Sequence, residues 1–192
     1  MADKKILYNI KKVQLSKITE MSTAGLPTYG EPIPVPGSVS LSLDNDSSSD
    51  IIYADGVAYY TPTGSNSYSG TLENVHFSNK VLQDIFNWVL DSNNNLVEVD
   101  SGSNEFGMQF AVDSDDGEVY FTMYRCSATK PSQNFQTKEA SATVNNESVD
   151  ITIMPITLAD GKTVIKSFAE KGATNYATYM TKITVPTIND SI

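Results

Sequence analysis

The chain has 192 residues, one cysteine and a formal net charge of −10 at pH 7. One cysteine excludes an intramolecular disulfide, and the excess of acids argues against a DNA-binding surface of the usual kind, which needs Lys and Arg to neutralise phosphates. No signal peptide is visible, and no apolar run approaches the roughly 18 residues of a membrane span. We therefore expect synthesis in the cytoplasm and no membrane partner.

The charge is unevenly distributed along the chain. Residues 1–17 hold five lysines and one acid, residues 18–124 hold sixteen acids and one lysine, and residues 125–192 are nearly balanced. Acidity of this kind can simply keep a soluble protein dispersed. A basic N-terminal segment is also complementary to an acidic middle block on another copy of the chain.

Residues 35–61 predict a long hairpin. Its first strand has an apolar face that alternates with serines, as in a half-buried strand: Val39, Leu41 and Leu43. Residues 51–60 predict the return strand, with residues 44–50 as a long loop between the two. That loop carries three acids and no base: Asp44, Asp46 and Asp50. It can be a metal site, a solvated turn or a contact with another copy.

A single clear helix is predicted over about residues 78–91. Ser78 can cap its N-terminus, and Asn93-Asn94-Asn95 can end it with left-handed backbone conformations. Five apolar residues fall on one face at spacings of three and four: Leu82, Ile85, Phe86, Val89 and Leu90. This pattern is typical of a surface helix that packs on a sheet.

The clearest hairpin spans residues 106–123, with the turn sequence DSDDG between its strands. Further strand segments are predicted on either side of Asn145-Asn146. We therefore predict a mainly β fold, with sheets that form a β-sandwich or barrel and one flanking α-helix. The whole chain, residues 1–192, is expected to be one domain with extended arms at about residues 1–30 and 178–192.

Residue types that catalysis needs are scarce. A Ser/His/Asp triad or a Cys/His pair would have to use His76 and Cys126, the only histidine and the only cysteine. The alternation places His76 at an exposed strand position and Cys126 among small core residues. No phosphate-binding or dinucleotide-binding motif occurs. We predict that the protein is not an enzyme and has no cofactor.

Calcium is the metal that the carboxylate clusters make a candidate ligand of this protein. They lie in two loops, Asp44/Asp46/Asp50 and Asp113/Asp115/Asp116/Glu118. The first begins like an EF-hand loop, but Ser49 stands where Gly is needed and Asp55 where a bidentate Glu belongs. The second has the composition of a tight hairpin turn. A solvated or inter-subunit loop is the preferred interpretation of both, and we predict no metal site.

In their order, these segments resemble the major tail tube proteins of long-tailed, non-contractile bacteriophages. The most specific stretches are VPGSVSLSL at 35–43, YADGVAYY at 53–60 and RCSATKPS at 125–132. The likeness covers most of the chain from about Ile10 onward. None of the three stretches is a catalytic signature.

The resemblance implies a structural virion protein. Such subunits assemble into hexameric rings, and the rings stack into a hollow tube through which the genome is ejected. DNA would pass through the lumen without sequence-specific binding. The implied partners are other copies of the chain and other tail proteins, namely the tape measure, the tail terminator and the initiator complex. The implied location is the virion tail, assembled in the host cytoplasm.

The charge pattern indicates where stacked copies would meet. We expect the inter-subunit contact to involve five residues: Lys11, Lys12, Asp44, Asp46 and Asp50. Exposed ion pairs contribute only about 0–1 kcal/mol each, so charge would set register and salt sensitivity, while apolar and strand-pairing contacts hold the assembly together. Some acids of the middle block are expected to line the lumen and repel DNA phosphates.

Two other classes stay open. One is a secreted or surface β-sandwich module that binds a glycan or depends on calcium, and a melting temperature that responds to calcium would favour it. The other is the tube subunit of a contractile tail or secretion system on the same fold, which a neighbouring sheath gene would favour.

Overall fold

The computed structural model describes residues 6–46, 52–54, 57–60, 67–135, 137 and 145–188. The fold is mainly β, as predicted, and one large antiparallel sheet dominates it. Its strands come in the chain order β1 (Leu7–Met21), β2 (Pro27–Tyr29), β3 (Ile33–Pro34), β4 (Ser38–Asn45), β7 (Tyr68–Asn74), β10 (Phe106–Ser114), β11 (Gly117–Ala128), β12 (Ser132–Gln133), β13 (Glu147–Met154) and β16 (Lys166–Ala169).

In the described part of the chain, three small ladders and two short helices lie outside this sheet. The ladders are β5 (Ile52–Ala54) with β6 (Val57–Tyr60), β8 (Val89–Leu90) with β9 (Leu96–Val97), and β14 (Ile156–Thr157) with β15 (Thr163–Val164). The helices are α1 (Asn79–Asp84) and the 3-10 helix η1 (Tyr176–Thr178).

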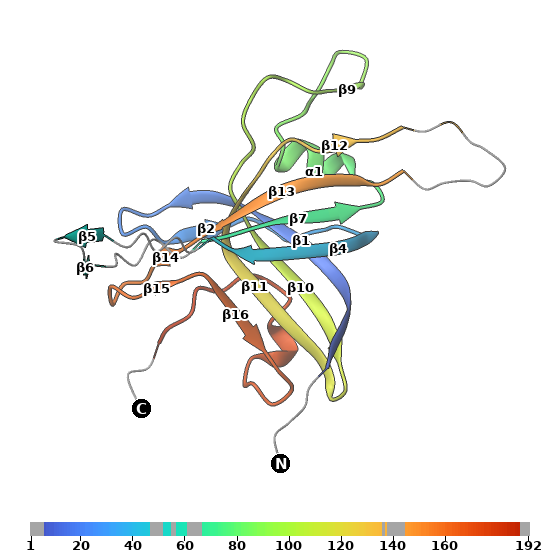
Figure 1. The fold of residues 1–192 in the computed structure, drawn as a ribbon. Helices are drawn as coiled ribbons and strands as arrows, with labels where there is room; N and C mark the ends of the chain where they lie inside the picture. Colours follow the sequence, from blue (N-terminus) through green and yellow to red (C-terminus); the bar gives the residue numbers. More distant parts are fainter. Residues whose placement is uncertain are drawn as a thin grey trace.

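The large sheet curls over itself into an open barrel. Its main strand order is β2-β1-β10-β11-β13-β7-β4, and β16 joins the first half of β11 while β13 joins the second half. The backbone N–H of Val35 donates to the carbonyl of Val13 at 2.8 Å, which ties the segment before β4 to β1. One layer therefore contains β1, β10 and β11, and the other contains β13, β7 and β4 (Figure 1).

The main core lies between these two layers and is covered at one end by α1. Alternation places one face of each strand inside, and the helix adds its apolar side. The fully buried members include Leu72, Phe77, Val81, Ile85, Phe106, Met108, Met123, Ile151 and Ile153. Cys126 is also buried among them, which confirms its predicted place in the core.

The helix is much shorter than the predicted range of 78–91. Ser78 caps it as predicted, because its Oγ accepts a hydrogen bond from the Val81 N–H at 3.4 Å. Asn87 then adopts φ 58°, a left-handed conformation that ends helical hydrogen bonding. The following residues Val89–Leu90 form β8, so the second half of the expected apolar helix face belongs to a hairpin.

The long hairpin at 35–61 has a different partner from the predicted one. Strand β4 pairs with β7, whereas β5 and β6 pair with each other. Leu41 and Leu43 pack against the core as expected, but Val39 is 47% exposed because a register shift lies between its two neighbours in the ladder. Most of the predicted loop 44–50, including Asp50, lies outside the described residues.

The expected N-terminal arm is instead the longest strand of the sheet. Strand β1 pairs with β10 along its first two thirds and with β3 and β2 on its other edge. Val13 and Leu15 point into the core and are buried. The prediction of an arm over residues 1–30 is therefore wrong for β1.

The described part of the C-terminal arm packs on the outer face of the same strands. Gln14 Nε2 donates to the Met180 carbonyl at 2.6 Å, and Gln109 Nε2 donates to the Tyr179 carbonyl at 2.8 Å. Ile183 lies directly over Gly107, where a Cβ would overlap with the Ile183 Cδ1. A bare backbone at Gly107 thus lets this segment lie flat on the sheet.

Candidate assembly surfaces

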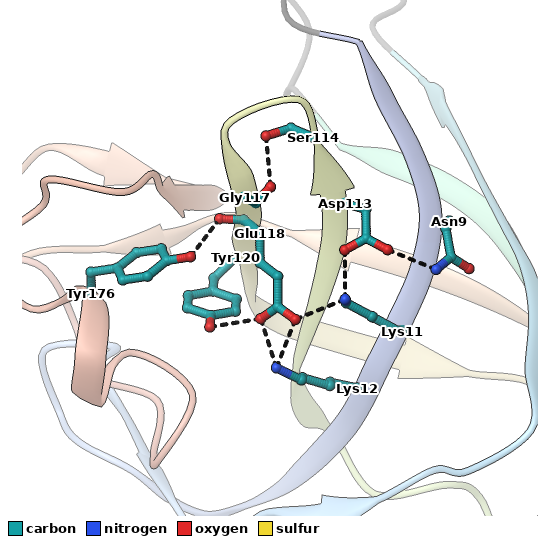
Figure 2. A network of polar contacts seen from close by, with 9 residues as sticks. All are labelled: Asn9, Lys11, Lys12, Asp113, Ser114, Gly117, Glu118, Tyr120 and Tyr176. Atoms are coloured by element: carbon teal, nitrogen blue, oxygen red, sulfur yellow. Dashed lines mark hydrogen bonds and ion pairs between the residues drawn. The ribbon is translucent and has the colours of Figure 1, made fainter.

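Lys11 and Lys12 are held by acids of their own chain (Figure 2). Lys11 Nζ lies 2.5 Å from Asp113 Oδ1 and 2.8 Å from Glu118 Oε1. Lys12 Nζ lies 2.6 Å from Glu118 Oε2. These contacts join β1 to the β10–β11 hairpin, so their predicted role between subunits stays a prediction.

Two irregularities in β1 make this arrangement possible. Consecutive residues of a regular strand point to opposite faces of the sheet, so Lys11 and Lys12 would normally diverge. Asn9 and Lys12 adopt φ values of 61° and 54°, and the ladder with β10 shifts register at both places. The shifts turn both ammonium groups toward Glu118. Asn9 also donates to Asp113 through its side-chain amide at 2.8 Å.

The network extends to the C-terminal segment. The Tyr120 hydroxyl donates to Glu118 Oε2 at 2.8 Å, and the Tyr176 hydroxyl donates to the Glu118 carbonyl at 2.8 Å. The rings of Tyr120 and Tyr176 stack with their centroids 4.7 Å apart. Hydrogen bonds from Lys11 and Lys12 lower the pKa of Glu118 to about 2. Burial and the bond to Glu118 raise the pKa of Tyr120.

Lysine ammonium groups thus pair with two of the carboxylates that the sequence offered as calcium ligands. Asp113 and Glu118 each have a lysine partner, and Asp115 and Asp116 lie in the exposed hairpin turn. Among the residues that the structure describes, no group of three or more His, Cys, Asp or Glu side chains could hold a metal ion.

Asp44 and Asp46 are exposed at the far end of β4. The Ser69 hydroxyl donates to Asp46 Oδ1 at 3.0 Å. Through β7 and β13, Asp44 is in register with Ser127 of β11, whereas Lys11 is in register with Tyr120. Seven residues of strand separate these two register positions. Among the described residues, no ion pair joins Lys11 or Lys12 to Asp44 or Asp46.

The single histidine lies just after β7, is 65% exposed, and contacts a buried acid that the sequence did not single out. Its Nδ1 lies 3.0 Å from Glu147 Oε1. Glu147 also accepts hydrogen bonds from the Phe77 N–H and from Gln133 Nε2, both at 2.7 Å. Burial by itself raises the pKa of Glu147, but the hydrogen bonds outweigh it and lower the pKa. This acid secures the chain where it enters α1.

An apolar groove lies at the end of the barrel where the β10–β11 hairpin turns. Its volume is about 360 Å³, and it is lined by Leu7, Tyr8, Asn9, Ile10, Leu41, Leu43, Phe110, Val112, Phe121, Met123 and Lys166. Two of the lining rings stack, with the centroids of Phe110 and Phe121 5.2 Å apart, and Phe168 lies beside the groove with its centroid 6.0 Å from that of Phe121. Phe168 is 63% exposed. We call this surface the open-end groove.

The β8–β9 hairpin projects from the opposite end of the barrel, beside α1 (Figure 1). Three of its apolar side chains are exposed: Val89, Leu90 and Val97. Its turn is held by Asp91 Oδ1, which accepts hydrogen bonds from the backbone N–H groups of Asn93 and Asn95 at 2.8 Å each. Those bonds also lower the pKa of Asp91.

Comparison with known proteins gives a likeness of fold. No protein-family model and no curated sequence matches the chain. A chain of the six-fold symmetrised baseplate of the anti-feeding prophage resembles it with a TM-score of 0.45 at 12% identity, over 88% of this chain and 97% of that one. A chain of the sheath–tube complex of an extracellular contractile injection system (PVC) gives 0.41 at 15% identity, over 84% and 90%.

A third solved structure with this likeness is Hcp1 from Salmonella typhimurium, with a TM-score of 0.37 at 9% identity, over 82% of this chain and 94% of that one. Within the described part of the chain, no helix combines the length and the apolar character that crossing a membrane requires.

Proposed function

We propose that the protein is a structural subunit that assembles with copies of itself into a tube of stacked rings. The observation that carries the proposal is the incomplete barrel. Among the described residues, β4 pairs only with β7 and β16 pairs only with β11, so each leaves an edge unpaired beside the open-end groove. Edges of this kind are pairing sites for another chain, and closing a sheet into a barrel removes them.

The finer assignment follows the sequence resemblance. In it the rings are hexameric, the tube belongs to a non-contractile phage tail, and the genome leaves through its lumen. The tape measure, tail terminator and initiator complex would then be partners, and the virion tail its location. A contractile injection tube is the second candidate, and its subunits would bind a sheath protein on the outer wall.

Negative-stain microscopy of the purified, concentrated protein tests the proposal. We expect rings or tubes, and sedimentation that shifts to larger species as the concentration rises. A protein that stays monomeric at every concentration and salt level would contradict it. Co-expression with sheath proteins separates the two candidates, because only a contractile-type tube should become covered by sheath.

Charge is proposed to adjust the contact between rings rather than to hold it together. The test replaces the acids of the 44–50 loop by serine, that is Asp44→Ser, Asp46→Ser and Asp50→Ser together. We expect tube length and yield to change with salt differently from those of the parent protein. Normal tubes at all salt concentrations would refute a role for these acids.

A further inference from the structure

The two exposed apolar surfaces have complementary shapes and lie at opposite ends of the molecule. The β8–β9 hairpin is a convex projection, whereas the open-end groove is concave. The loop after β9 is tied to α1 where the Asn104 N–H donates to the Ile85 carbonyl at 2.7 Å, next to the start of β10. The groove lies at the other end of β10, at Val112, about 27 Å further along the strand.

Among the described residues, no other part of the same chain covers either apolar surface. Leu90 is 51% exposed, and its ladder partner Leu96 is only half-buried. At the groove, Leu7 and Tyr8 of β1 are each at least half exposed, and so is Phe168 of β16 beside it. Exposed apolar clusters of this kind mark surfaces that another molecule covers.

The charges at the two surfaces are opposite. Asp91 at the hairpin turn is bonded by the neutral asparagines Asn93 and Asn95, so its negative charge is not neutralised. Lys166 at the rim of the groove lies over the Tyr68 ring, 4.2 Å from its centroid, and has no carboxylate partner among the described residues. A hairpin seated in the groove would bring the two charges toward each other.

We propose that the β8–β9 hairpin of one copy seats its Val89, Leu90 and Val97 side chains in the open-end groove of the next copy along the tube. This inference rests on the proposed function, and it names the surfaces that stack one ring on the next. A contact between different surfaces of identical chains is head-to-tail, and because these two surfaces lie at opposite ends of the molecule, it can repeat along an axis. Both apolar surfaces are covered in every copy except those at the two ends of the tube.

Cross-linking tests the proposed pairing directly. Cys126 is buried, so a cysteine introduced at the surface is the reactive thiol of the folded protein. One preparation carries Leu90→Cys and a second carries Phe168→Cys, and a short bismaleimide is added to each alone and to their mixture under assembly conditions. We expect covalent dimers in the mixture and few in either preparation alone. Dimers that form equally well in the separate preparations would overturn the proposal.

Blocking one surface at a time gives a second test. Leu90→Asp removes the hairpin surface and Phe168→Asp the groove surface, while Leu90→Met and Phe168→Leu are the matched apolar controls. Each aspartate variant alone should form rings but no stacks. Their mixture should form stacks two rings high, because only one hairpin–groove pair is then intact. Tubes of normal length from either aspartate variant would contradict the proposal.

These outcomes separate the inference from the function on which it rests. Tubes that form without the Leu90–Phe168 cross-link leave the tube function standing and reject the hairpin–groove contact. A protein that forms neither rings nor tubes, with native circular dichroism in every variant, rejects both. Single rings of the parent protein that never stack reject the contact and leave only ring formation.

Discussion

Phenylalanine side chains are buried at one end of the barrel and exposed at the other. At the end covered by α1, Phe77 is fully buried and its ring packs edge-on against Phe86, with the centroids 6.1 Å apart. At the open end, Phe168 stands over Phe121 with most of its surface in solvent. One end is closed within a single chain, whereas the other leaves apolar rings exposed, and we propose that another copy covers them.

The acids at the two ends also differ in burial. Glu147 at the covered end is buried and receives the backbone N–H of Phe77. Glu118 at the open end is only partly buried, with 21% of its side chain exposed, and pairs with two lysines that are more exposed. The first therefore supports the fold of the subunit, while the second fixes β1 and the C-terminal segment to a hairpin tip.

The largest effect is expected from truncation at the covered end. Phe77→Ala should lower the free energy of unfolding by about 3–5 kcal/mol, because it removes a fully buried ring and leaves a cavity against α1. Urea denaturation of the unassembled subunit measures this. A loss below about 1 kcal/mol would mean that α1 does not complete the core.

A smaller loss is expected at the acid beneath the helix. Glu147→Ala leaves the Phe77 N–H without its acceptor and should cost about 1–3 kcal/mol, whereas Glu147→Gln keeps one acceptor oxygen and should cost less. Thermal unfolding of both variants checks the order. Equal stabilities for the two would show that water replaces the carboxylate.

At the open end, Glu118→Gln should lower the melting temperature by only roughly 2–4 °C at neutral pH, because the lysine ends of the ion pairs it breaks are partly exposed to solvent. The pKa of Glu118 is lowered from 4.5 to about 2 in the folded state. Its contribution is therefore fully present above pH 4.5 and is lost as the pH falls toward 2.

The pH dependence sharpens this prediction. Melting curves of the parent protein should lose stability between pH 4.5 and 2, and Glu118→Gln should lose less over that window. Parallel curves for the two proteins would show that Glu118 is not the group whose protonation is responsible.

The smallest effect on the subunit itself is expected at the exposed ring. Phe168→Ser should change the free energy of unfolding of the unassembled subunit by no more than about 0.5 kcal/mol, because the side chain has few neighbours to lose. The same variant should reduce tube yield strongly, as sedimentation would show. A large loss of subunit stability would place Phe168 in the core and remove the contrast between the two ends.

The sequence predicted local features well. The β10–β11 hairpin has strict alternation and a turn rich in Asp and Gly, and both determine its register without help from the rest of the chain. The Ser78 cap is equally local. By contrast, residues 51–60 and 68–74 both alternate, so periodicity could not tell which of them pairs with β4.

Features that depend on the irregular backbone could not be predicted. The left-handed conformation of Asn87 shortens the helix, and that of Lys12 brings two neighbouring lysines to one acid. The sequence held one usable signal, Gly107 inside an otherwise apolar strand. A glycine at such a position is typical of a strand that another segment of the chain approaches closely. It could have indicated that a segment lies over the outer face.

The pairing of β1 with β10 has a consequence for how the protein is made. Leu7 pairs with Ser114, so the first part of β1 has no partner strand until more than half of the chain has been synthesised, although its second part can already pair with β2 and β3. Contacts so distant in sequence slow folding, and a waiting strand with an apolar face is prone to aggregate. A chaperone that shields the first part of β1 during this interval is therefore expected to raise the yield of folded protein.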